Sequence, residues 1–254
     1  MNATKSSFNS LKTFFGEKKL RLLSAQWLDK YAPVLSDEEL CNLFEGVFGE
    51  SASYFEIKGN AKSVAEKLMV EFYHNEAFIK SSIINLLKKE KNVTFFEMPL
   101  LDSRIDVCSI NGHSCAYEIK TSYDTVKRLK KQVNDYLKAF ELVYVVCPTE
   151  KIEEVLRIVP ECVGIFIYDN EKNSGELSIF RLPIISSFID ANIQFNLLHK
   201  NEKKAAINFV DDGEKMNNYF KSCLKKRYSK KWCSFKKKSS AINKLDYQYR
   251  FNLC

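Results

Sequence analysis

The chain has 254 residues, with 39 basic and 32 acidic side chains, a formal net charge of +7, and 45% apolar residues. This composition excludes a disordered, collagen-like or low-complexity chain, and the length fits one large domain or one domain with a small appendage. No apolar run is long enough to span a bilayer and the N-terminus lacks a signal peptide's apolar stretch, so we expect a soluble, cytoplasmic protein. The eight cysteines include no Cys-x-x-Cys pair, which predicts reduced thiols rather than a zinc site.

Short helices are predicted for residues 1–60, which we treat as a helical N-terminal segment. One helix should begin after Ser36, because a Glu three residues later completes a capping box. A second Ser-x-x-Glu box at residues 63–66 predicts the start of another helix. Apolar residues at helical spacing predict a further helix over residues 76–87.

After residue 92 the pattern changes to β-strands, and an α/β core is predicted over residues 61–185. The Asn-Gly dipeptide at 111–112 is a strong hairpin signal, because both residues tolerate positive φ. The predicted elements are, in order, strands 93–100, 104–110 and 115–120, a helix 123–140, a strand 142–147, a helix 149–159, a strand 164–168 and an edge strand 176–182. This order predicts a central mixed β-sheet flanked by helices.

Positive charge gathers at the end of the C-terminal extension, residues 186–254. Residues 221–254 carry eleven basic side chains against one acid, a local charge of +10 that leaves −3 for residues 1–220. Aromatic residues alternate with these cations, a mixture that neutralises phosphates and stacks on unpaired bases. Nucleic-acid contact is therefore expected through Lys225, Lys226, Arg227, Lys230, Lys231 and Trp232. The alternative is a solubilising basic helix packed by its aromatic residues.

One hairpin concentrates the residues that can carry chemistry. Residues two apart on a strand share a face, so Glu118 and Lys120 should project together, and the hairpin can place Asp106 beside them. Carboxylates are costly to bury unless they are paired or bind metal, and two of them beside a lysine suit a hard cation such as Mg²⁺. The alternative is an exposed ladder of charges on a solvated sheet face.

At these residues the sequence resembles the PD-(D/E)XK nuclease superfamily, over roughly residues 76–182. Asp106 matches the family's Asp, and Glu118 and Lys120 match its Glu-x-Lys. In the next predicted helix, Gln132 and Tyr136 are similar to the Gln-x-x-x-Tyr element of RecB-like members. The same region also resembles one small, mostly uncharacterised bacterial branch. The chain departs from the family pattern in lacking the proline that often precedes the Asp.

The resemblance implies a restriction-endonuclease-like core and a catalytic set of Asp106, Glu118, Lys120 and an upstream acid. We assign the upstream acid to Glu76, with Glu97 as the alternative and Glu71 as the third choice. The implied cofactor is Mg²⁺, for which Mn²⁺ would substitute, and its expected ligands are Asp106, Glu118, the carbonyl of Ile119, and Glu97. The implied nucleic-acid contacts in the core are Arg104, Arg128, Gln132 and Tyr136.

The function implied by the resemblance is metal-dependent hydrolysis of phosphodiester bonds in nucleic acid, with DNA favoured over RNA. Phage defence, mobile-element biology and DNA repair all remain open as its setting. The alternatives are a non-cleaving nucleic-acid-binding protein on the same fold and an RNA-directed nuclease effector. Many nucleases of this type dimerise, so a homodimer stays open, as does a protein partner bound through residues 1–60.

Overall fold

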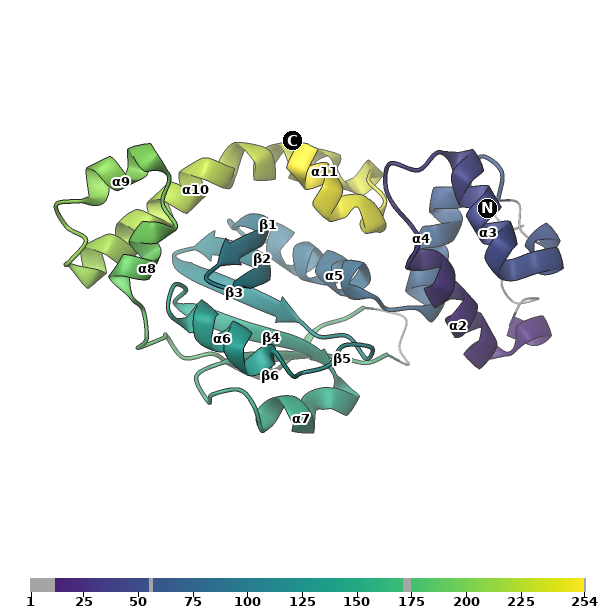
Figure 1. The fold of residues 1–254 in the computed structure, drawn as a ribbon, viewed down its shortest axis with the longest axis horizontal. Helices are drawn as coiled ribbons and strands as arrows, with labels where there is room; N and C mark the ends of the chain where they lie inside the picture. Colours follow the sequence, from purple (N-terminus) through teal and green to yellow (C-terminus); the bar gives the residue numbers. More distant parts are fainter. Residues whose placement is uncertain (1–11, 55–56, 171–174, 254) are drawn as a thin grey trace.

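A six-stranded mixed sheet forms the centre of the computed structural model, which describes residues 12–54, 57–170 and 175–253 (Figure 1). The strands lie in chain order, with β1 to β3 antiparallel, β3 to β5 parallel and β6 antiparallel at the far edge. Their bounds are β1 Val93–Leu100, β2 Ser103–Asn111, β3 His113–Ile119, β4 Leu142–Pro148, β5 Gly164–Tyr168 and β6 Ser178–Arg181. The predicted α/β class with a central mixed sheet is confirmed.

The hairpin between β2 and β3 turns at the predicted dipeptide. Gly112 has φ +77°, the left-handed conformation that costs glycine little. The turn sets the register, in which Asn111 pairs with His113 and Val107 with Tyr117. Because β2 and β3 are joined so tightly, Asp106 and Glu118 come to adjacent positions on neighbouring strands.

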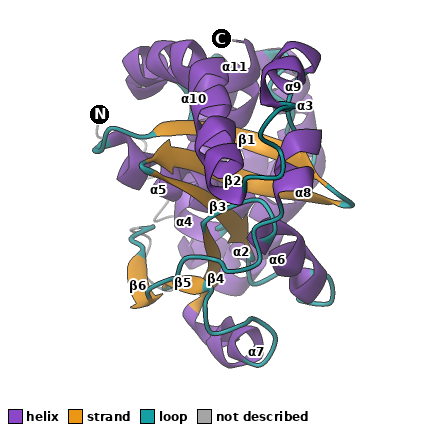
Figure 2. Ribbon diagram, turned by 90° about the vertical axis from the view of Figure 1, so that its left-hand side faces the viewer, coloured by secondary structure: helices purple, strands orange, loops and turns teal. Residues whose placement is uncertain are grey.

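Two helices flank the sheet on opposite sides (Figures 1 and 2). One is α5, Glu76–Lys88, and the other is α6, Leu129–Leu137, while α7, Ile152–Leu156, follows β4 after a 3₁₀ turn. The predicted helix over residues 123–140 is too long at its start. The Asp124 carboxylate accepts bonds from the Thr121 amide at 2.7 Å and hydroxyl at 2.8 Å. Such local side-chain bonds compete with helix formation and make this segment a turn.

The N-terminal helices form a separate group beside the sheet (Figure 1). They are α2 Glu17–Leu28, α3 Asp37–Phe48, the 3₁₀ helix η1 Gly49–Tyr54 and α4 Ala61–Phe72. The predicted capping box at Ser36 is confirmed at the start of α3. The box predicted at residues 63–66 is wrong, because the N-cap of α4 is Asn60, three residues before Ser63. Because α4 packs against α2 and α3, it belongs to this helical group.

The C-terminal extension covers the β1 edge of the sheet rather than standing apart from it (Figures 1 and 2). It contains α8 Ala191–Asn196, α9 Lys200–Ala206, α10 Gly213–Lys238, two 3₁₀ turns and α11 Tyr247–Leu253. Tyr228 of α10 stacks on Phe95 with centroids 4.1 Å apart, and Phe96 packs edge-on against Phe251 of α11. Trp232 is only 2% exposed, so its expected role as a nucleic-acid contact is wrong. Most aromatic residues of this segment pack inward, with Tyr249 an exposed exception, while Lys225, Lys226 and Lys230 are exposed.

Hydrogen bonds join the C-terminal segment to the N-terminal helices. The Tyr31 hydroxyl donates to Asp246 at 2.7 Å, and the Asn243 amide donates to the carbonyl of Lys62 at 2.7 Å. No helix within residues 12–54, 57–170 and 175–253 has the length and apolar character needed to cross a membrane. The cysteines in these ranges are all free thiols.

Replacing Phe235 by alanine should lower the free energy of unfolding by about 3–5 kcal/mol, because it empties a fully buried site between β1 and α11. Denaturant unfolding measures the loss. The matched control is Tyr249→Ala, because Tyr249 lies in the same C-terminal segment but is 36% exposed. The free energy of unfolding should fall much less in Tyr249→Ala. Equal losses in the two variants would contradict the packing described above.

Candidate active site

Charged and polar side chains line a cleft of about 580 Å³ formed by β1, β2, β3 and the neighbouring ends of α5 and α6. Its lining includes the acids Glu76, Glu97, Asp102, Asp106, Glu118 and Asp124, together with Arg104, Lys120, Arg128, Lys131 and Gln132. Most of the core residues expected from the sequence to take part in chemistry therefore share one cleft.

Glu118 is the most deeply buried acid of this cleft, at 1% exposed. Its Oε1 accepts hydrogen bonds from Lys120 Nζ at 2.7 Å and from Gln132 Nε2 at 2.5 Å. Its other oxygen lies 2.6 Å from the Tyr136 hydroxyl, which also lies 2.7 Å from the carbonyl of Arg104. Burial raises the pKa of Glu118, while Lys120 and the bonds from Lys120 and Tyr136 lower it.

Lys120 is held at the cleft by two partners. Its ammonium donates to Glu118 and, at 3.1 Å, to the amide oxygen of Gln132. The lysine is 8% exposed, so its methylene stem is buried while its ammonium reaches the lined space. An ammonium has three protons, and these two bonds leave the third for a ligand in the cleft.

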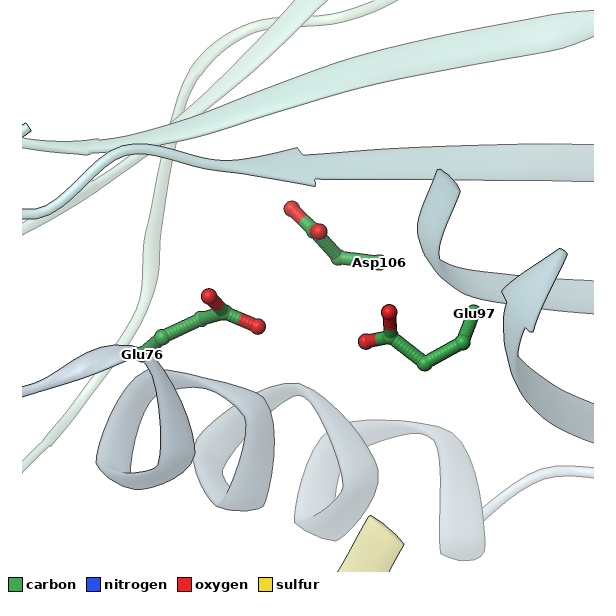
Figure 3. A group of neighbouring side chains, drawn as sticks. All are labelled: Glu76, Glu97 and Asp106. Atoms are coloured by element: carbon green, nitrogen blue, oxygen red, sulfur yellow. The ribbon is translucent and has the colours of Figure 1, made fainter. Parts of the chain in front are cut away.

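A second group of acids lies beside this network (Figure 3). One carboxylate oxygen from each of Glu76, Glu97 and Asp106 lies within 4.8 Å of the other two. The three residues come from α5, β1 and β2, so the group depends on the tertiary fold. Oxygen ligands in such a group suit Mg²⁺ or Mn²⁺, and these three side chains are the best placed in the described ranges to hold one.

Glu97 adopts a strained backbone conformation. Its φ is +55°, in the left-handed region that non-glycine residues seldom adopt within a strand. In the β1–β2 ladder, Phe96 pairs with Val107 and Met98 with Ile105, so Glu97 lies opposite Asp106 where regular pairing is interrupted. Local strain of this kind costs about 1–3 kcal/mol and is concentrated at functional sites. The distorted residue, Glu97, therefore carries one of the three clustered carboxylates.

Lys80, which the sequence did not single out, lies among these acids. Its ammonium donates to Glu76 at 2.8 Å and to Glu97 at 2.6 Å. A third bond, at 2.8 Å, goes to the side-chain oxygen of Gln248 in α11. The lysine is 3% exposed. Burial lowers its pKa, but the charges of Glu76, Glu97 and Asp106 outweigh burial and raise it.

Asp106 is the carboxylate whose charge is least compensated. Burial raises its pKa well above the ordinary range, and Glu118 and Glu76 raise it further. Lys80 and a 2.6 Å bond from the Ile119 amide act in the opposite direction. A divalent cation would relieve this repulsion, so the donor set fits such an ion.

The rim of the cleft carries cations that are accessible to a ligand. Arg104 is largely exposed and contacts Glu97 at 3.2 Å. Lys131 contacts Asp102 at 3.2 Å and Asp135 at 3.0 Å while staying half exposed. Arg128 is exposed at the start of α6. Exposed ion pairs of this kind are weak and rearrange easily, so these cations can turn toward an anionic ligand.

The structure regroups several residues that the sequence had assigned. Both candidates for the upstream acid, Glu76 and Glu97, belong to the cluster around Asp106, whereas Glu71 lines a different pocket with His74. Glu118 lies outside that cluster and binds Lys120, Gln132 and Tyr136 instead. Tyr136 is fully buried, so its expected role as a nucleic-acid contact is wrong, and it orients Glu118.

Lys80 and Gln248 are the site residues that sequence reasoning missed. Lys80 follows Glu76 by four residues, the spacing that places two side chains on one helix face, and it interrupts an apolar stripe with a charge. That combination is a usable signal for a buried ion pair. Nothing in the local sequence of Gln248 indicates its contact, which is separated from Lys80 by 168 positions.

The buried Asp106 predicts a specific pH effect on stability. Its raised pKa means that the folded state holds this proton more tightly than the unfolded state, so stability contributed by Asp106 falls as pH rises above about 4. In EDTA, Asp106→Asn should therefore gain stability relative to the parent protein as pH rises from 5 to 8. Denaturant unfolding at pH 5 and pH 8 measures the difference. The matched control is Asp102→Asn at the exposed rim, and an equal gain in both variants would contradict this account.

Comparison with known proteins places the chain in a family. It is 30% identical over 105 residues to "Protein cII" of Enterobacteria phage P4, a match that covers 41% of this chain and 40% of that relative. A solved protein of unknown function from Silicibacter pomeroyi, SPO1766, is 19% identical and covers 54% of this chain and 90% of its own, with a TM-score of 0.37. The family model of bacteriophage P4 protein cII matches residues 69–252, which include the whole sheet and the candidate site. The chain therefore belongs to the bacteriophage P4 protein cII family.

Proposed function

We propose that this protein is a metal-dependent nuclease of the PD-(D/E)XK type, acting on nucleic acid with DNA favoured over RNA. The observation that carries the proposal is the meeting of Asp106, Glu118 and Lys120 in one cleft, on neighbouring strands in the order the resemblance requires. A further acid from α5 lies beside them, at a place where such nucleases often carry an upstream acid. Surface charge ladders do not produce this arrangement, because Glu118 and Lys120 are buried and specifically bonded.

Each protein group has a defined part in the proposed reaction. Glu76, Glu97 and Asp106 would hold Mg²⁺ or Mn²⁺, and the bound ion would supply positive charge for the scissile phosphate and acidify a water molecule. Lys120 would donate a hydrogen bond through its third N–H to the attacking water or to a phosphate oxygen, and Glu118 fixes that ammonium in place. Gln132 and Tyr136 keep Glu118 in one rotamer, which preorganises Lys120 before substrate binds.

Substrate affinity would come from cations outside the acidic centre. Arg104 and Arg128 stand at the rim of the cleft, and α10 presents exposed lysines to solvent. Contacts of this kind neutralise phosphates and carry no base-specific information. The proposal therefore predicts binding that depends strongly on salt and weakly on sequence.

One observation favours a second candidate, a nucleic-acid-binding protein that does not cleave. Lys80 already supplies a positive charge to Glu76 and Glu97, so these two acids are compensated without a divalent ion. A protein that had stopped cleaving could keep the fold in this form. The two candidates differ in whether the cleft turns over substrate, and that difference can be measured directly.

Cleavage of labelled single-stranded DNA, duplex DNA and RNA, with Mg²⁺ or Mn²⁺ and with EDTA, tests the proposed activity. Lys120→Ala should lower the rate at least 100-fold, because it removes the positioned donor while leaving the acids in place. The control is Lys127→Ala, since Lys127 is an exposed lysine just before α6. Cutting that survives in Lys120→Ala would refute the assigned site. Binding without cutting of any substrate would favour the second candidate.

The exposed lysines of α10 are predicted to contribute affinity rather than turnover. Replacing Lys225, Lys226 and Lys230 together by alanine should reduce the slope of log K against log salt by about 2–3 for duplex DNA. Fluorescence anisotropy over a salt series measures this slope. The control replaces Lys18, Lys30 and Lys58, which are exposed lysines on the N-terminal helical group. An unchanged slope in the α10 variant, or an equal change in the control, would show that α10 does not contact the phosphate backbone of the DNA.

A further inference from the structure

Large apolar side chains are exposed on β6 and on the segment that follows it, at the edge of the sheet opposite α10. Six large apolar side chains within ten residues are at least half exposed, and we call them the β6 patch. They are Ile179 at 56%, Phe180 at 50%, Leu182 at 67%, Ile184 at 62%, Ile185 at 54% and Phe188 at 58%. Single exposed apolar residues are ordinary on protein surfaces, whereas six of them within ten residues of one segment favour an interaction site.

The backbone that presents the patch is fixed to the body of the protein. The amide of Ile184 donates to Cys162 at 2.9 Å, and the amide of Ser186 donates to Glu141 at 2.8 Å. The Ser186 hydroxyl also donates to the carbonyl of Leu137 at 2.6 Å. Gly164 allows the segment to pass closely, because a Cβ there would lie 3.0 Å from the ring of Pro183. The patch is therefore displayed in one conformation, which lowers the entropic cost of binding.

The patch also lacks exposed charge. The sequence from 177 to 189 contains one ionisable side chain, Arg181. Its guanidinium turns inward and donates to Val163 at 2.8 Å and to Pro160 at 3.0 Å. A charged or highly polar partner would gain no favourable binding free energy on such a surface. An equally apolar surface would be complementary to it.

The two edges of the sheet differ in what covers them. At one edge, α10 covers β1, whereas at the other β6 pairs only with β5 among the described residues (Figure 2). Natural proteins protect a bare edge with charges, prolines or covering elements, because it offers unpaired backbone groups to another strand. Within β6 itself, the exposed side chains include Ile179 and Phe180, and no exposed charge protects it.

We propose that the β6 patch is the interface of a homodimer, in which a second copy of this chain places the same patch against it about a two-fold axis. An uncharged apolar surface is complementary to itself, as an isologous interface requires. The six side chains expose on the order of 700 Å² in total, close to the roughly 800 Å² that each partner buries in a standard interface. Pairing patch to patch also covers the bare edge of β6. This inference does not depend on the proposed nuclease activity.

Light scattering coupled to size-exclusion chromatography, over a concentration series from about 1 to 100 µM, tests the proposal. The protein should elute with a mass near twice the 29.5 kDa of one chain. The double variant Phe180→Lys and Ile184→Lys should elute as a monomer at every concentration, with an unchanged circular dichroism spectrum. The matched control is Leu22→Lys with Val34→Lys, two residues of the N-terminal helical group that are 59% and 70% exposed. It should remain dimeric.

Two results would overturn the proposal. A parent protein that stays monomeric at 100 µM would leave the patch for a different partner. A dimer that persists in the Phe180→Lys and Ile184→Lys variant would place the interface elsewhere on the surface. Circular dichroism separates loss of the dimer from loss of the fold, because both substitutions are at side chains at least half exposed.

Discussion

A carboxylate buried at the centre of the sheet constrains much of this structure. Glu118 is almost inaccessible to water, and an uncompensated charge there would cost several kcal/mol. Its partners come from β3 and α6, and through Tyr136 it is connected to the backbone of β2. Both the side of the sheet on which α6 packs and the rotamer of Lys120 depend on completing the hydrogen bonds of Glu118. A polar centre of this kind specifies one arrangement of strands and helix, because few alternatives would satisfy all of its bonds.

The parts of the fold that depend on local pattern were predictable from the sequence. The β-strands at 93–100, 142–147 and 164–168, the Asn-Gly hairpin and the helix at 76–87 were all placed within a residue or so. The meeting of Asp106, Glu118 and Lys120 followed from strand alternation and one tight turn. The predicted helix start at 123 failed because the Asp124 side chain bonds to Thr121 instead of leaving the backbone to form a helix.

The contacts that sequence reasoning missed are long-range. The inward packing of Trp232 and Phe235 could not be distinguished from an exposed stacking surface, because helical spacing alone does not say which face meets β1. The position of Lys80 among the acids depends on β1 as well as α5, and its third partner comes from α11. Residues that lie far apart in sequence meet there, and their meeting has no local signature.

The contacts of α11 and of the 3₁₀ turn before it bear on the order in which the molecule is assembled. Asp246 bonds to Tyr31 across 215 positions, and Gln248 completes the shell around Lys80. Contacts of such separation form late, after the intervening chain has been synthesised. A growing polypeptide that has not yet reached Gln248 therefore carries the acids without their full set of partners. The acidic centre therefore acquires its final geometry only after Gln248 has been synthesised, and chains cut short before that residue lack the finished site.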